Sequence, residues 1–286
     1  MTGLSGGAGS LVQTIAKEGE MRNRSLWIIV ALVVVGTLLC CCIAAGAAGL
    51  AAYLTAAPTV REGGIGRIDE RTEQTFDVGR APMLEVDTFA GSIRVLAGGG
   101  GEIRVKTTKQ AGNSSQLDEI SVDVVGTEDG VRVRASAPSY GTGRRAVDVE
   151  LMVPPDARLR VDTGAGNVEV EGVVGEIEAH AGAGNIEVEG GAGPVNLDTG
   201  AGEVAYTGSP EGGCVFSTGA GNVTLRMPAA LDAEVELHTG IGTIELDGFD
   251  VAGEVSDTEV DGVIGSGERA TIEAQTGAGD VDLVQQ

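Results

Sequence analysis

Aromatic residues are scarce in this chain of 286 residues, with one Trp, three Tyr and four Phe. Large conventional cores draw much of their buried area from aromatic side chains, so this composition argues against one. Proline is rare at 8 residues while glycine supplies 47, a composition that excludes both collagen and a proline-rich linker. Lys and Arg number 19 against 42 Asp and Glu, giving a net charge of −23. Such an acidic chain repels phosphate, so we exclude nucleic acid as a partner.

The longest apolar run covers 29 uncharged residues, 26–54. About 20 apolar residues cross a bilayer, so the run predicts one transmembrane helix that anchors the protein in the cell membrane. Residues 1–25 begin with a Gly- and Ser-rich stretch and predict a disordered tail. Basic residues favour the cytoplasmic side, and Lys17, Arg22 and Arg24 precede the run. We expect a single-pass protein with an extracytoplasmic C-terminal domain; cleavage of the run as a signal peptide is the alternative.

Three of the four cysteines, Cys40, Cys41 and Cys42, lie within this run. We interpret them as small apolar packing residues, with S-acylation as the alternative. The fourth, Cys214, falls at an inward position of the repeats described next and is predicted to be a buried thiol. Because only one cysteine lies outside the apolar run, we expect no disulfide within the C-terminal part.

The C-terminal part repeats itself with a period of 18 residues. Near copies of the string TGAGN begin at positions 163, 181, 199, 218, 239 and 276, and a related string, TFAGSIRVL, begins at Thr88. Each 18-residue unit has two halves of nine residues, and each half has a turn followed by alternating apolar and polar residues. This alternation is typical of a strand with one buried face.

Nine residues are too few for a strand, a crossover helix and a turn, so the repeat predicts a coil of short strands. The predicted fold is all-β: a parallel β-solenoid (β-helix) with 18-residue coils of two strands each, preceded by the transmembrane helix. We assign 55–75 to a juxtamembrane linker, 76–160 to an irregular N-terminal β part and 161–286 to the regular solenoid. Residues 250–268 interrupt the period as an irregular turn. The final coil ends three residues after Leu283 without an obvious cap.

Charge is divided unevenly between the two predicted β parts. Residues 58–160 contain 14 basic and 16 acidic residues, whereas residues 161–286 contain 2 basic and 24 acidic residues. The regular repeats are therefore strongly acidic, and the part before them is nearly neutral.

Two segments carry a resemblance to a known family. The stretch VPPDARLRVDTGAGNVEVEG at 153–172 resembles the bacterial putative-adhesin family of Gly-rich β-solenoid repeat proteins, and TIEAQTGAGDVDL at 271–283 is similar to the usual C-terminal coil of that family. The resemblance covers residues 76–286. It implies the solenoid architecture, membrane anchoring and, for some members, a place beside envelope-stress systems. It provides no catalytic residues to assign here.

The outward carboxylates of the repeats form the one candidate metal site. A calcium roll needs Asp at position six, where every TGAG half of this chain has Val, Ile or Leu pointing inward, so that kind of site is excluded. Adjacent coils would instead stack acids outward, and a hard cation would relieve their repulsion. The candidate ladder is Glu169, Glu171, Glu187, Glu189, Glu245 and Asp247. We favour a solvated acidic face that keeps the β-structure soluble, and we predict no cofactor.

Two other recurring residue types receive a structural interpretation. Asn167, Asn185 and Asn222 occupy one position of the repeat and predict an amide ladder. His180 and His238 are predicted to face outward, with no neighbour at metal-ligand spacing, and we interpret them as surface residues.

No nucleophile elbow, zinc-protease motif or phosphate-binding loop occurs in the chain, so we expect no catalysis. The sequence predicts a cell-surface, adhesin-like interaction module that binds an unidentified surface or envelope component along a repetitive face. The alternatives are a membrane-attached scaffold polymer that self-associates through its uncapped end, and an envelope-stress accessory protein. A sugar-active enzyme is a third hypothesis, weakened by the few aromatic residues available as sugar platforms.

Overall fold

The structure, a computed structural model, describes residues 59–63, 67–98, 100–138 and 143–286. All of them belong to one compact unit, Ala56–Gln286, and a second unit, Met1–Thr55, lies outside the described residues. Nearly all of the regular secondary structure of the described part is strand, which confirms the all-β class. The predicted tail and transmembrane helix fall outside this part. Within it, no helix has the length and apolar character needed to span a membrane.

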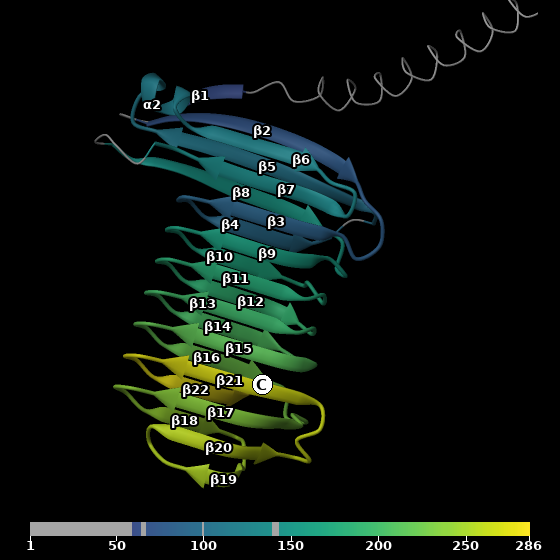
Figure 1. Ribbon diagram of the computed structural model, residues 1–286, viewed down its shortest axis with the longest axis vertical. Helices are drawn as coiled ribbons and strands as arrows, with labels where there is room; N and C mark the ends of the chain where they lie inside the picture. The colour runs from purple at the N-terminus through teal and green to yellow at the C-terminus, as the bar shows by residue number, and fades with distance from the viewer. Residues whose placement is uncertain (1–58, 64–66, 99, 139–142) are drawn as a thin grey trace, which may run out of the picture. The chain divides into compact units, whose positions relative to one another are not determined.

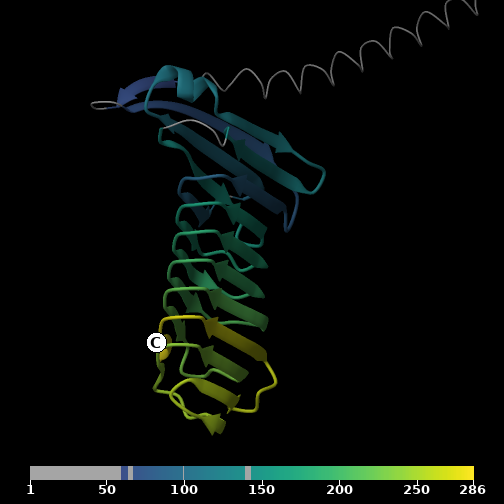
Figure 2. The same ribbon diagram turned by 60° about the vertical axis from the view of Figure 1, so that its left-hand side comes forward.

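The strands form two sheets of eleven strands each, visible in Figure 1 and, turned by 60°, in Figure 2. Sheet A contains, in spatial order, β1 (Thr59–Gly63), β2 (Arg67–Asp77), β5 (Glu102–Ala111), β8 (Arg145–Val153), β4 (Ile93–Ala97), β10 (Val168–Glu171), β12 (Ile186–Gly191), β14 (Val204–Gly208), β16 (Val223–Met227), β22 (Val281–Gln285) and β18 (Ile244–Asp247). Sheet B contains β19 (Ala252–Val255), β20 (Glu259–Ile264), β17 (Ala233–Thr239), β21 (Ala270–Thr276), β15 (Gly212–Thr218), β13 (Val195–Thr199), β11 (Ile177–Ala181), β9 (Arg158–Thr163), β3 (Met83–Thr88), β7 (Gly130–Ser136) and β6 (Ser121–Gly126). One short helix, α2 (Ser114–Asp118), follows β5.

Each repeat forms one coil, in which a strand of sheet B passes through a glycine corner into a strand of sheet A. The apolar residues of the alternating pattern point between the sheets, and Ile177 and Ile186 are 0% exposed. Successive coils pair in parallel at the predicted offset, with Val168 opposite Ile186 and Ile177 opposite Val195. The predicted inward and outward faces of these repeats are therefore confirmed. The core is one layer of mostly small and branched side chains between the sheets.

Two aromatic side chains form the bulkiest part of this core. Tyr206 and Phe216 are both 0% exposed, and their ring centroids lie 5.3 Å apart. The Tyr206 hydroxyl donates to the Gly191 carbonyl oxygen at 2.9 Å, which satisfies its only polar group. Cys214 is buried beside them, as predicted, and burial raises the pKa of both its thiol and the Tyr206 phenol.

The corners between the sheets bring successive backbones close together. At Gly166, φ is +148°, a conformation that favours glycine. A Cβ at this position would lie 2.0 Å from the Gly91 carbonyl oxygen of the neighbouring coil, far inside van der Waals contact. Equivalent glycines repeat this arrangement in a column: Gly184, Gly202, Gly221, Gly242 and Gly279.

At four of these corners, a buried threonine bonds one coil to the next. Thr199 Oγ1 donates to the Gly184 carbonyl oxygen at 2.8 Å, and Thr218 Oγ1 donates to that of Gly202 at 2.9 Å. The repeat that begins at position 181 has alanine instead, so the Gly166 carbonyl has no such donor from Ala181. The threonines therefore satisfy backbone oxygens that the tight corner turns toward the next coil.

The asparagines of the repeat also join coils, but not as predicted. The Asn167 side-chain oxygen accepts from the Asn185 backbone N–H at 3.1 Å, and that of Asn185 accepts from the Glu203 N–H at 2.9 Å. The Asn222 side chain accepts from the Asp280 N–H at 3.0 Å in the same way. These side chains thus form hydrogen bonds with the backbone of the next coil, not with one another. The reason is that the corner leaves those N–H groups without a strand partner.

Both sheets are mixed, so the prediction of a parallel solenoid is wrong for the molecule as a whole. The interior strands pair in parallel, but β1, β2 and β5 pair antiparallel in sheet A, as do β6 with β7 and β20 with β17 and β19 in sheet B. The physical reason is the edge problem: a parallel coil at the end exposes open N–H and C=O groups, and a returning antiparallel strand covers them.

The N-terminal end is built by an excursion from the coil path. The coil of β3 and β4 pairs directly with β9 and β10, with Thr88 opposite Thr163. Strands β5 to β8 lie outside this path, and β7 and β8 pair with the other side of the first coil. Strand β2 then pairs with β5, so residues 67–77 extend a sheet where the sequence predicted a linker at 55–75.

The coil that comes last in the sequence does not lie at the end of the stack. Strand β22 lies between β16 and β18, and β21 lies between β15 and β17. The same threonine bonds recur on both sides: Thr276 Oγ1 donates to the Gly221 oxygen and Thr239 Oγ1 to the Gly279 oxygen, each at 2.8 Å. The uncapped final coil was therefore a wrong prediction. The irregular residues 250–268 instead contain β20, which covers the outer edge of β17, and β19, which pairs with β20.

The glycine column generates a prediction about stability. Gly221→Ala should destabilise the fold by about 3 kcal/mol or more, because φ there is +145° and the new Cβ would lie 2.0 Å from the Gly202 oxygen. The matched control is Gly213→Ala in β15, where no atom lies within 4 Å of the added Cβ. Urea unfolding followed by circular dichroism measures both variants. Equal midpoints would contradict the role given to the corner.

The missing threonine generates a second prediction. Ala181→Thr should stabilise the fold by about 1 kcal/mol, because its hydroxyl would reach the Gly166 oxygen as other threonines of the column reach theirs. Ala181→Val is the control for shape and β-propensity without a donor. Thermal unfolding of both variants separates the causes. A gain from valine equal to that from threonine would assign the effect to packing instead of the hydrogen bond.

Candidate functional site

The outward side chains of sheet A form continuous rows across the coils because the strands pair in register. One row, here called row A, passes through the centre of the sheet. In spatial order it contains Lys106, Glu150, Arg94, Glu169, Glu187, Ala205, Thr224, Asp282 and Glu245. A single register therefore places residues from distant parts of the sequence side by side.

Charges alternate in the N-terminal part of row A. Lys106 Nζ lies 2.6 Å from Glu150 Oε2, and Arg94 Nε donates to Glu169 Oε2 at 2.6 Å. Arg94 also lies opposite Glu150, so it is flanked by an acid on each side. These pairs are exposed, and exposed ion pairs contribute little to stability. Their main consequence is that carboxylates of neighbouring strands do not face each other at this end.

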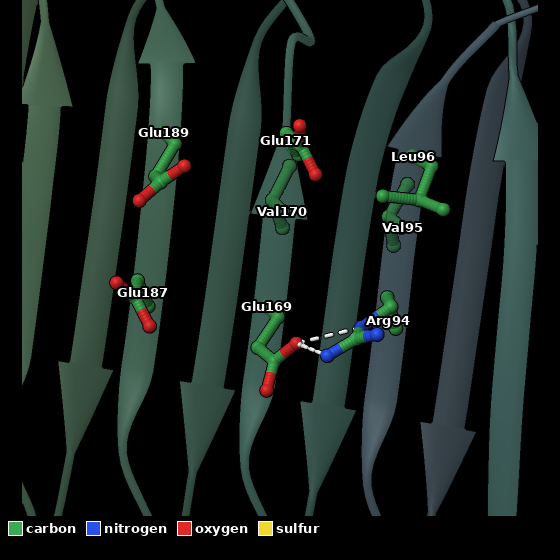
Figure 3. Close-up of a pocket in the computed structure, with 8 residues that line it drawn as sticks. All are labelled: Arg94, Val95, Leu96, Glu169, Val170, Glu171, Glu187 and Glu189. Carbon is green, nitrogen blue, oxygen red and sulfur yellow. Dashed lines mark hydrogen bonds and ion pairs between the residues drawn. The ribbon is translucent and has the colours of Figure 1, made fainter.

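The alternation ends after Glu169. Figure 3 shows Glu171, Glu187 and Glu189 beside the Arg94–Glu169 pair, around a shallow hollow on the face of the sheet. Glu187 lies opposite Glu169, and Glu189 lies opposite Glu171. Within the described part of the chain, no basic residue forms an ion pair with Glu171, Glu187 or Glu189. Like charges at strand spacing repel, so this patch presents a strong negative potential to solvent.

The candidate metal ladder is not one cluster. Its first four members are the carboxylates of β10 and β12 just described, but Glu245 and Asp247 lie on β18. Three strands, β14, β16 and β22, separate the two groups. Among the described residues, no three His, Cys, Asp or Glu side chains converge in a way that would hold a metal ion. The acids lie side by side on a face of parallel strands, so their carboxylates do not converge on one point.

Sheet B has a corresponding row in which a histidine lies among acids. Asp162 and Asp198 occupy the strands on either side of His180, directly opposite it. His180 Nε2 lies 3.2 Å from Glu178 Oε1, and Nδ1 lies 3.7 Å from Asp198 Oδ2. The sequence alone predicts His180 as an isolated surface residue, but the strand pairing places it among these acids. The 18-residue offset between 162, 180 and 198 was the signal that could have found this group.

One carboxylate of row A is held in an unfavourable position. Asp282 on β22 is half-buried, directly opposite Glu245 and close to Asp280. Burial and the charges of these two neighbours raise the pKa of its carboxyl. Asp282 contributes nothing to the core. Its charge therefore destabilises the fold locally, because the final coil is inserted among acidic strands.

No family model and no curated protein matches the chain. Solved structures similar to it include a putative cell adhesion protein from Clostridium sporogenes, 14% identical, covering 76% of this chain and 100% of that chain with a TM-score of 0.46. A putative adhesin from Bacteroides fragilis is 11% identical and covers 74% of this chain and 96% of that chain, with a TM-score of 0.43. A putative lipid binding protein from Parabacteroides distasonis is 9% identical and covers 76% and 96%, with a TM-score of 0.32. Likenesses this distant transfer no function to this chain.

The position of Asp282 generates a prediction with a defined pH dependence. A carboxyl whose pKa is raised by folding favours the folded state when protonated and loses that contribution as pH rises through the folded pKa. Asp282→Asn should therefore raise the free energy of unfolding at pH 7, by about 0.5 kcal/mol, a size typical of exposed charge interactions. The gain should shrink as pH falls toward 4.

Urea unfolding at pH 7 and at pH 4 measures this effect. The control is Asp250→Asn, which removes one exposed carboxylate from the turn after β18. A gain from Asp282→Asn that stays constant with pH, or equals that of the control, would contradict the proposed repulsion.

Proposed function

We propose that the protein is a cell-surface, adhesin-like interaction module without catalytic activity, anchored in the membrane through residues 26–54. Its partner would be an unidentified surface or envelope component that binds along an extended face. The single observation that carries this proposal is the in-register stacking of outward charges on sheet A, which brings together Glu171, Glu187 and Glu189, none of which forms an ion pair within the described residues. A repeated row offers many weak contacts in one direction, and a basic partner would complement it.

The core supports a binding role over a sugar-active one. Carbohydrate sites commonly stack sugars on exposed aromatic faces, and the two largest aromatic side chains of the repeats, Tyr206 and Phe216, are fully buried. The open face of row A also lacks a deep pocket in which an acid and a base would close around one bond. These features favour a surface that binds over one that reacts.

The position of the final coil argues against the scaffold-polymer alternative. That hypothesis needs an exposed final coil for end-to-end stacking, but β21 and β22 lie inside the stack. The outer edge of β17 is paired with β20. At the other sheet's edge, the Ile244 N–H of β18 donates to the Asp257 carbonyl oxygen at 2.8 Å. A role as an envelope-stress accessory protein stays a prediction of the resemblance alone.

The proposal predicts that attachment of cells depends on the acidic patch. Cells that carry the full chain should be retained on a cationic polymer surface, and the combined change Glu171→Gln, Glu187→Gln and Glu189→Gln should lower retention several-fold. The control Glu176→Gln, Glu254→Gln and Glu268→Gln removes the same charge from exposed positions that do not form a row, and it should retain binding. The difference should vanish at high salt, since exposed charges are screened.

Protease treatment of intact cells checks the location in the same experiment. An epitope tag after Gln286 should be digested without lysis if the domain is extracytoplasmic. Protection of the tag until the cytoplasmic membrane is broken would reject the surface location. Equal retention of the two triple variants, with the tag exposed, would reject the acidic patch as the binding face.

A further inference from the structure

The C-terminal coil, here defined as residues 270–286, fills a slot between two other coils. In Figure 1 its yellow strands β21 and β22 lie between the green strands of β15 and β16 and those of β17 and β18. Residues 270–286 are synthesised after residues 233–247, yet the coil at 233–247 lies beyond them in the stack. Until residues 270–286 are available, the slot must therefore be empty, or the strands at its edges must pair with other strands.

Both walls of the slot present strand edges that pair with the strands of the C-terminal coil. Strand β21 pairs in parallel with β15 from Gly212 to Thr218 and with β17 from Ala233 to Thr239. Strand β22 pairs with β16 and β18 in the other sheet. Ile272, Ala274, Val281 and Leu283 fill the core between them and are at most 1% exposed. An empty slot would expose this apolar layer and two pairs of strand edges, a state that strongly favours capture of a matching segment.

One short connection links this coil to the rest of the chain. Ile264 at the end of β20 and Ala270 at the start of β21 both lie opposite Ala233, on the two sides of β17. Residues 265–269 cross the end of β17 between them. The crossing is Gly-rich and largely exposed, with φ of +72° at Gly265 and +75° at Gly267. A crossing of this kind changes conformation without disturbing a core.

Asp232 fixes this crossing. Its Oδ1 accepts from the Ser266 N–H at 2.7 Å and from the Gly267 N–H at 2.6 Å, and the Ser266 hydroxyl donates to Oδ2 at 2.9 Å. These hydrogen bonds hold the pKa of the Asp232 carboxyl below its usual value. Asp232 therefore holds the crossing 265–269 in the conformation that leads the C-terminal coil into the slot of its own chain.

We propose that the slot is a strand-acceptor site, and that the C-terminal coil of one copy occupies the slot of a second copy in an exchanged dimer. The occupant is a second copy because only its residues 270–286 reproduce every pairing and core contact of both walls. An exchanged dimer has the same contacts per chain as the monomer and differs in the crossing 265–269 alone. Its formation depends on local concentration, which confinement of copies to a surface would raise.

Cross-linking between two copies of the full chain tests the proposal. The copies carry different tags and Cys40→Ala, Cys41→Ala and Cys42→Ala, so that buried Cys214 is the only native thiol left. One copy has Thr224→Cys on β16 and the other has Asp282→Cys on β22, two outward residues that lie directly opposite each other. A short bismaleimide reagent should yield a species that carries both tags, in a fraction that rises with expression level.

Three controls define the outcome. A single copy with both changes should cross-link internally, which shows that the slot is filled. The combination of Glu187→Cys in one copy and Asp282→Cys in the other reports chance collision, because three strand steps separate these positions. Asp232→Ala should raise the two-tag fraction several-fold by releasing the crossing, whereas Asp250→Ala should not. Internal cross-linking alone, with two-tag products no more abundant than the collision control at every expression level and in Asp232→Ala, would overturn the proposal.

Discussion

The close approach of successive backbones at the glycine corner is the constraint on which the rest of the structure depends. With no side chain at Gly166 or its equivalents, each corner rests against the carbonyl group of the next coil. This contact fixes the spacing and the register of neighbouring coils together. The threonine hydroxyls and asparagine oxygens then find backbone partners at constant positions. A larger side chain at the corner would separate the coils and break all of these bonds at once.

The same constant register explains how both ends are built. Because every coil presents the same edge, a coil does not have to pair with the one next to it in the sequence. At one end, strands β5 to β8 leave the path, and β7 and β8 pair with the far side of the first coil. At the other, the chain builds β19 and β20 against β17 before it returns to insert β21 and β22. Each excursion covers an edge that a simple spiral would expose.

Because the strands pair in register, the repeated outward charges also form a pattern on the surface. Where Lys106 and Arg94 alternate with acids, the stacked charges compensate one another. Where the repeat offers only acids, carboxylates such as Glu169 and Glu187 are stacked opposite each other. The fold tolerates this because the carboxylates face water and contribute little to stability. Asp282 is the exception, since it is half-buried on an inserted strand between other coils.

The sequence by itself determined the short strands, their inward and outward faces, the parallel pairing of the regular repeats and the buried state of Cys214. These features follow from local alternation and from the offset between identical motifs such as those at Thr163 and Thr199. It also identified the outward acids of β10 and β12 and grouped Glu245 and Asp247 with them, although the spatial order of the coils places three strands between the two groups. Only the tertiary structure decided that order, the antiparallel ends and the acids around His180. The physical reason is that every coil edge offers equivalent hydrogen bonds, so the repeat alone cannot specify which coils are neighbours. The order of the coils is set by the edges at the two ends, which must be covered.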